Sequence, residues 1–178
     1  MSGHTHKRHK TLLAPLLIVG GSVALCAYSV VAVLSADPVW FLGRATVPDP
    51  ERIVVRVAGQ ETVLTAGSLG YDQIVAATRQ SLSSFQSLSF LSAGLSEAAL
   101  EEYQHRATVV ELYFDRPVDF HLPVNDRRPT ALLIPIEGHL AGRGYVFLGR
   151  GGAWWAGPMQ MTDPQPLLDA LSALGFIG

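Results

Sequence analysis

TLLAPLLIVGGSVALCAYSVVAVLSA, residues 11–36, is the stretch that decides the architecture of this chain, because it contains no charged side chain. The hydrocarbon core of a bilayer is about 30 Å thick, and about 20 apolar residues in a helix are enough to cross it. Lipid offers no hydrogen-bond partners to the backbone, so a crossing segment of this length is helical. The sequence therefore predicts one transmembrane helix over residues 11–36, which anchors the protein in the lipid bilayer.

The charges on either side of this segment predict its orientation. Lys7, Arg8 and Lys10 lie just before it, and Asp37 lies just after it. Basic residues that flank a membrane span tend to stay in the cytoplasm. We therefore expect a short basic cytoplasmic tail, residues 1–10, and an extracytoplasmic position for everything after the span. The expected localisation is the cell membrane, with a single pass.

Two kinds of processing compete with an uncleaved anchor. A cleaved signal peptide has an apolar region of roughly 7–15 residues, and this run is much longer. A lipoprotein would use Cys26, the only cysteine, but bulky Leu25 precedes it and the apolar run continues for ten more residues. An uncleaved signal-anchor fits the length best, although the sequence alone does not decide whether the segment is ever cleaved.

The composition after the span bounds the rest of the protein. Residues 37–51 hold three prolines, which is typical of a short stiff tether, and residues 52–178 are enough for one domain of ordinary size. All 15 acidic residues lie after the span, against ten arginines and no lysine, which gives a net charge of −5. This arginine-only composition is typical of a GC-rich bacterium. A mildly acidic surface offers no footprint for nucleic acid, and no nucleic-acid partner is expected.

The first part of the domain combines a hairpin pattern with helical patterns. Two alternating β-branched runs flank Gly59-Gln60, which predicts a hairpin with a two-residue loop. Apolar residues at helical spacing predict an amphipathic helix over residues 71–85. Ser96 is a good N-cap for a second helix that ends near Arg106. Residues 81–95 are rich in serine and fit either a continued helix or a short strand.

The second half is rich in strand patterns. Apolar and β-branched residues alternate or run together over residues 108–114, 118–124, 131–136, 145–148 and 153–156. Pro123 and Pro135 suit edge strands or bulges, and the sequence at 149–152 predicts a hairpin. Asp163, followed by proline, caps a final helix that Gly175 ends. Hairpins segregated from helices predict an α+β domain with a mainly antiparallel sheet and two to three packed helices.

Asp115, Asp119 and His121 are the residues closest to a catalytic or metal-binding cluster. Carboxylate and imidazole groups can bind a divalent ion, so a membrane-tethered hydrolase that uses these three residues is the alternative function. Their spacing matches no recognised set of metal ligands, and exposure on the polar face of a strand explains Asp119 and His121. We therefore expect no metal site and no cofactor, and favour a non-catalytic protein over an enzyme.

A tryptophan pair near the C-terminus is the best candidate for a binding surface. Trp154 and Trp155 are followed by Met159 and Met161. Adjacent residues on a strand point to opposite faces, so one tryptophan can be buried while the other is exposed or covered by a helix. An exposed tryptophan beside methionines is typical of a binding anchor. The pattern does not decide which of the two is exposed.

These patterns favour a single-pass membrane-anchored accessory, assembly or sensory protein that contacts another membrane or envelope protein. Gly20 and Ala24 form a small-x-x-x-small pair within the span, through which two copies would be able to pack as a homodimer. A convergent Asp/His cluster in one pocket would favour the hydrolase. A flat apolar patch around Trp154 or Trp155 would favour the contact protein.

Overall fold

The structure is a computed structural model that describes residues 8–35, 47–82, 95–120 and 128–178. The chain divides into two compact units, one that contains the first helix and one that contains the described residues 47–82, 95–120 and 128–178, which we call the folded domain. In the described residues there are four helices and one six-stranded antiparallel sheet. The predicted α+β class is confirmed.

The first helix, α1 (Arg8–Ser35), covers almost all of the apolar run. Among the described residues it is the one helix that is long and apolar enough to cross a membrane, over Pro15–Val33. Ser22 and Ser29 each donate their hydroxyl to the backbone carbonyl four residues earlier, at 2.8 Å. These hydroxyls are therefore satisfied within the helix, as an apolar environment requires.

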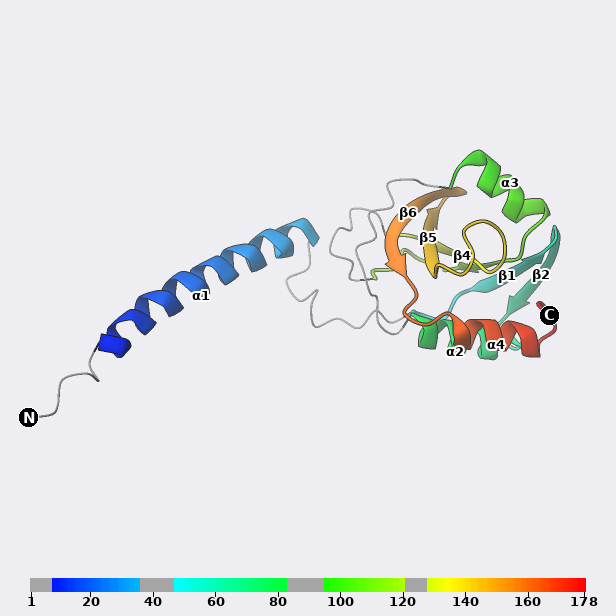
Figure 1. The fold of residues 1–178 in the computed structure, drawn as a ribbon. Coiled ribbons are helices and arrows are strands. Elements are labelled where there is room, and N and C mark those ends of the chain that lie inside the picture. The colour runs from blue at the N-terminus through cyan, green and yellow to red at the C-terminus, as the bar shows by residue number, and fades with distance from the viewer. Residues whose placement is uncertain (1–7, 36–46, 83–94, 121–127) are drawn as a thin grey trace, which may run out of the picture. The chain divides into compact units, whose positions relative to one another are not determined.

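All strands of the folded domain belong to one sheet, in the order β2-β1-β3-β4-β5-β6, and each neighbouring pair is antiparallel (Figure 1). The strands are β1 (Arg52–Val57), β2 (Gln60–Thr65), β3 (Val109–Tyr113), β4 (Ala131–Pro135), β5 (Tyr145–Arg150) and β6 (Ala153–Gln160). Consecutive strands are neighbours in the sheet, except that β3 pairs with β1 and not with β2. This order places β1 and β3 side by side, which becomes important for the site.

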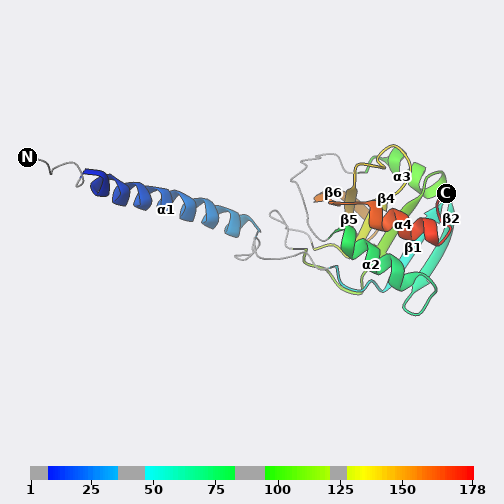
Figure 2. The same cartoon turned by 60° about the horizontal axis from the view of Figure 1, so that its bottom comes forward.

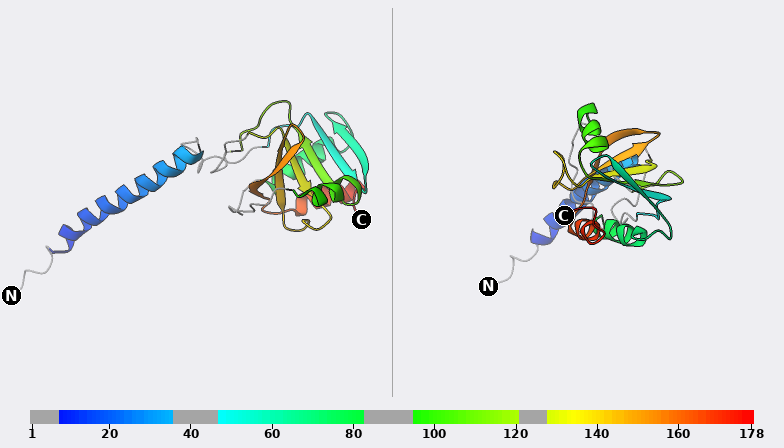
Figure 3. Two further views of the ribbon diagram at one scale, coloured as in Figure 1. Left: turned by 90° about the horizontal axis from the view of Figure 1, so that it is seen from above. Right: turned by 90° about the vertical axis from the view of Figure 1, so that its right-hand side faces the viewer.

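Three helices cover the two faces of the sheet. They are α2 (Tyr71–Ser81), α3 (Glu97–His105) and α4 (Gln165–Ala173). Figure 2 shows α2 and α4 side by side on one face of the sheet, and Figure 3 shows α3 on the opposite face. The helix predicted over 71–85 ends at Ser81, and residues 83–94, within the undecided segment, lie outside the described residues.

The face under α2 and α4 is the larger apolar core. Every second residue of β1, β3, β4 and β5 points into it and is nearly inaccessible to water: Ile53, Val55, Val110, Leu112, Leu132, Ile134, Val146 and Leu148. The helices contribute Ile74, Val75, Leu167 and Leu171, which are equally buried. Full burial of such a side chain contributes roughly 1.5–3 kcal/mol. On the opposite face, Tyr103 of α3 packs on a smaller cluster formed by Val109, Leu133 and Phe147.

Both tight hairpins have two-residue loops with two positive φ angles, as type I′ turns require. Gly151 and Gly152 join β5 to β6 with φ of 60° and 81°, and Ala58 and Gly59 join β1 to β2 with φ of 48° and 84°. The loop predicted at Gly59-Gln60 therefore lies one residue earlier, at Ala58-Gly59. Glycine takes the second loop position, and Ala58 accepts the strained first position so that β2 can begin at Gln60.

The helix ends follow the predicted capping chemistry. Ser96 accepts a hydrogen bond from the Ala99 amide at 3.2 Å, which confirms it as an N-cap. The start of α4 is one residue later than predicted, because Pro164 is the N-cap and not the first helical residue; Asp163, one position earlier, accepts a hydrogen bond from the amide of Gln165, the first residue of α4, at 2.9 Å. Gly175, with φ of 76°, ends α4 in a Schellman motif, in which the Phe176 amide donates to the Leu171 carbonyl.

Two strand predictions are wrong. Residues 118–120 form no strand, although Val118 and Phe120 are buried and Asp119 between them is exposed; residues 121–124 lie outside the described part. The alternation therefore reflects burial in an extended loop and not sheet pairing. The strand that ends in Pro135 is an interior strand, not an edge. Its proline is tolerated because β5 pairs with β4 only over residues 131–133, so the missing N–H lies beyond that ladder.

The described end of the predicted tether is attached to α2. Val47 is buried, and its carbonyl accepts a hydrogen bond from Arg79 Nε at 2.8 Å. The same guanidinium pairs with Asp49 at 2.9 Å, and the Tyr71 hydroxyl donates to the Pro50 carbonyl. Residues 47–51 therefore belong to the folded domain.

Candidate functional site

One row of side chains crosses the α3 face of the sheet, with one residue from each strand. Residues that are opposite each other in neighbouring strands share a face, and the register aligns Thr65, Arg52, Tyr113, Ala131, Gly149 and Trp154. We call these six residues the aromatic row. Ala131 and Gly149, which lie between Tyr113 and Trp154 in this row, are its smallest residues, so the sheet leaves room there for a large ring.

Trp154 bends over the glycine of its own row. A Cβ placed on Gly149 would lie 2.4 Å from two atoms of the Trp154 ring, so the indole rests directly on the glycine backbone. The rings of Trp154 and Tyr113 meet edge to face, with centroids 6.5 Å apart and planes at 65°. Both rings line a pocket of about 280 Å³, together with Thr130, Ala131, Gly149, Arg150, Gly151, Gly152 and Ala153.

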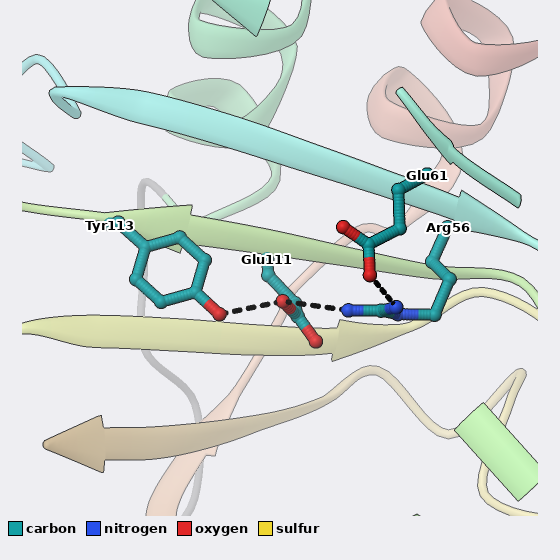
Figure 4. Close-up of polar contacts among 4 residues, drawn as sticks. All are labelled: Arg56, Glu61, Glu111 and Tyr113. Carbon is teal, nitrogen blue, oxygen red and sulfur yellow. Dashed lines mark hydrogen bonds and ion pairs between the residues drawn. The ribbon is translucent and has the colours of Figure 1, made fainter. Parts of the chain in front are cut away.

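A polar cluster lies next to the aromatic row on the same face (Figure 4). Tyr113 donates its hydroxyl to Glu111 Oε2 at 2.7 Å, and Arg56 Nη2 lies 3.7 Å from the same oxygen. Arg56 also pairs with Glu61 of β2. The side chains of Glu111 and Arg56 are only 7% and 15% exposed, whereas that of Glu61 is half exposed. The cluster therefore runs from a buried carboxylate to the solvent at β2.

These contacts fix the orientation of the Tyr113 ring. Burial, and then the hydrogen bond and negative charge of Glu111, raise the pKa of the Tyr113 hydroxyl above its usual value. The phenol is therefore protonated at neutral pH and remains a hydrogen-bond donor to Glu111. The guanidinium carbon of Arg52 lies 4.3 Å from the centre of the same ring, a cation–π contact. Tyr113 is thus held by Glu111 through its hydroxyl and by Arg52 over its face.

The predicted tryptophan surface is divided between the two faces of the sheet. Trp154 belongs to the aromatic row on the α3 face, while Trp155 is opposite Leu148, which points into the α2/α4 core. Both tryptophans are half-buried. Met161 is buried, at 6% exposure, and the side chain of Met159 lies outside the described part. Of the four residues, Trp154 is therefore the one that lines a pocket on the surface.

We predict that Gly149→Ala destabilises the protein by about 1–2 kcal/mol, because the new methyl must displace the Trp154 ring. Urea unfolding of the full chain in one detergent, followed by tryptophan fluorescence, measures the loss. Gly178→Ala is the control, since a Cβ there meets nothing within 4 Å. Adding Trp154→Leu to Gly149→Ala should recover part of the loss. Equal stability of the Gly149 and Gly178 variants would show that the ring does not rest on Gly149.

The residues of the hydrolase alternative are only partly described. Asp115 and Asp119 line one pocket of about 690 Å³, together with charged side chains such as Arg79 and Arg116. Asp119 lies 3.6 Å from Arg128. His121 lies outside the described residues. Among the described residues, no group of three or more His, Cys, Asp or Glu side chains is placed to hold a metal ion. In the described part, the two aspartates thus share a pocket with arginines and with no imidazole.

The sequence interpretation missed Arg52, Arg56, Glu111 and Tyr113. A signal for two of them was present, because Glu111 is a single acid within the apolar run 108–114 and Arg56 interrupts an equally apolar strand. Isolated charges of opposite sign in two apolar strands indicate a buried pair. Pairing them, however, requires knowing that β1 and β3 are neighbours.

Comparison with models of known protein families, with characterised proteins and with solved structures gave no match to this chain. The function is therefore inferred from the residues of this protein alone.

Proposed function

We propose that this protein is a single-pass membrane-anchored accessory, assembly or sensory protein that works through contact with another envelope protein. The observation that carries the proposal is α1, whose apolar side chains point outward all around the helix; Leu16, for example, is 74% exposed. A helix that is apolar on every side needs a protein core or a bilayer around it. A bilayer fits best, because the hydroxyls of Ser22 and Ser29 on this helix surface bond to their own backbone.

The orientation follows from the flanking charges. Lys7, Arg8 and Lys10 precede the apolar run and favour a cytoplasmic N-terminus. The folded domain then lies on the extracytoplasmic side. Gly20 and Ala24 offer one route to a homodimer within the membrane, since small residues four apart let two helices approach closely.

Contact rather than catalysis is supported by the site. Its buried carboxylate, Glu111, is occupied by Arg56 and by the Tyr113 hydroxyl. Its open part is a small aromatic-walled pocket, which suits a protein anchor better than a reacting group. Detergent extraction followed by affinity capture should recover a membrane or envelope protein in near-equal amount. A chain that is recovered alone under several mild detergents would contradict a role as a stable subunit.

Cysteine labelling tests the orientation. With Cys26 replaced by alanine, we predict that Gly178→Cys reacts with a membrane-impermeant thiol reagent on intact cells, with the outer membrane opened if there is one. The control, Ser2→Cys in the basic tail, should react only after the inner membrane is broken. The reverse pattern would contradict the proposed orientation, and equal labelling of both positions in the soluble fraction would contradict the anchor.

A further inference from the structure

We propose that the pocket lined by Tyr113 and Trp154 binds one apolar side chain of an acidic peptide segment on a partner protein. This inference rests on the proposed function, because it names the chemistry of the contact. Its first support is the shape of the site. Both rings line the pocket, and Thr130, Ala131 and residues 149–153 of the β5–β6 hairpin complete its lining.

The size of the pocket fits a single side chain. Sites for drug-sized ligands occupy roughly 300–1,000 Å³, and this pocket, at about 280 Å³, lies just below that range. A phenylalanine- or leucine-sized group is therefore the natural occupant. Interfaces commonly obtain most of their binding energy from such a buried anchor, which is surrounded by weaker polar contacts.

The charges beside the pocket favour a partner segment with negative charge. Arg150 lines the pocket, and the guanidinium of Arg52 lies over the ring of Tyr113, which lines it too. Within the described residues neither guanidinium has a carboxylate partner, whereas Arg56, Arg79 and Arg128 are all ion-paired. Two unpaired cations beside an apolar pocket, on a domain that is acidic overall, are complementary to carboxylates that flank the inserted side chain.

The pocket is also rigid before binding. Tyr113 is held by Glu111 and Arg52, and Trp154 is held against Gly149. Side chains that are already ordered lose little entropy when a partner docks, so a larger share of the contact energy appears as affinity.

The experiment uses the full chain in nanodiscs, with its tryptophans replaced by 5-fluorotryptophan. The probe is a synthetic hexapeptide with one phenylalanine flanked by aspartates, titrated while fluorine NMR follows each tryptophan; single Trp→Phe variants assign the signals. We expect saturable binding that shifts the Trp154 signal and leaves that of Trp155, on the opposite face, in place. The same peptide with alanine for phenylalanine, or with lysines for aspartates, should bind at least tenfold more weakly.

Reversing the charge of the two arginines tests whether the peptide binds at this pocket or is attracted to the domain non-specifically. Arg52→Glu combined with Arg150→Glu should weaken binding of the acidic peptide at least tenfold, because the two cations are replaced by carboxylates that repel it. Both arginines are exposed, so the exchange does not alter the core. Arg143→Glu, another exposed arginine away from the pocket, is the matched control and should leave the affinity within twofold. Fluorescence of an unlabelled sample confirms that each variant is folded.

Three results would overturn the proposal: no binding of the acidic peptide up to millimolar concentration, binding without a change at Trp154, or equal weakening by the Arg143 control. Each of these leaves the membrane role standing if a partner still copurifies with the full chain. If the cysteine-labelling pattern fails, in contrast, the proposed membrane role is contradicted. Peptide binding at Trp154 is still measured independently in that case.

Discussion

Replacing Val19 and Val23 by arginine is expected to prevent insertion of the chain into the membrane. Both side chains lie in the middle of α1, one turn apart, and are more than 60% exposed. An arginine at the centre of a membrane helix costs about 2.5–3.5 kcal/mol for insertion, so two cost about 5–7 kcal/mol. This corresponds to a shift of roughly four to five orders of magnitude in the insertion equilibrium.

The measurement is the fraction of the protein that resists alkaline carbonate extraction, together with labelling of a cysteine at Gly178 in intact cells. The matched control is the same pair changed to alanine, which keeps the helix apolar and should leave the protein in the membrane. Were the arginine variant to stay in the membrane with its C-terminus outside, α1 would not be the anchor, and another segment would hold the protein there.

The local features of the fold were predictable because short-range chemistry determines them. Ser96, Asp163 and Gly175 mark helix ends, since each satisfies backbone groups that a helix leaves unpaired. Gly151-Gly152 marks a hairpin for a similar reason: few other residues tolerate two successive positive φ angles. Features of this kind depend on neighbours in the chain and are visible without knowledge of the tertiary structure.

The errors arose where one pattern has two physical causes. Alternating burial at Val118, Asp119 and Phe120 comes from an extended loop whose apolar residues are buried, with the Phe114 and Phe120 rings packed edge to face at 6.2 Å. A paired strand would give the same alternation. Pro135 predicted an edge strand or a bulge because proline cannot donate to a ladder, but the end of an interior strand satisfies the same restriction.

The candidate site was not predictable, because it depends on strand order. Arg52, Tyr113 and Trp154 come from β1, β3 and β6 and are far apart in sequence. They fall in one row only because β3 pairs with β1 and not with β2. The sequence did point to Trp154, but nothing near it in the chain indicates that Gly149 provides the space for its ring.

Removal of the buried carboxylate is expected to give the largest loss of stability in the folded domain. Glu111→Leu leaves the largely buried Arg56 with one partner, the half-exposed Glu61, and leaves the Tyr113 hydroxyl without its acceptor. Breaking one side of a buried ion pair costs about 3–5 kcal/mol. We expect about 3 kcal/mol, at the low end, because Glu61 still compensates part of the arginine charge. Urea unfolding of the full chain in one detergent measures the difference.

A double variant separates the penalty of an unpaired charge from a simple loss of packing. Arg56→Met with Glu111→Leu removes both charges and keeps the apolar volume, so stability should return to within about 1 kcal/mol of the original protein. Glu61→Gln is the control, because its half-exposed pair with Arg56 contributes at most about 1 kcal/mol. If the double variant were as unstable as Glu111→Leu alone, the carboxylate would act through its shape and its bond to Tyr113, and Arg56 would owe its position to Glu61. Recovery in the double variant would instead show that the loss in Glu111→Leu comes from the charge of Arg56, which that variant leaves without its buried partner.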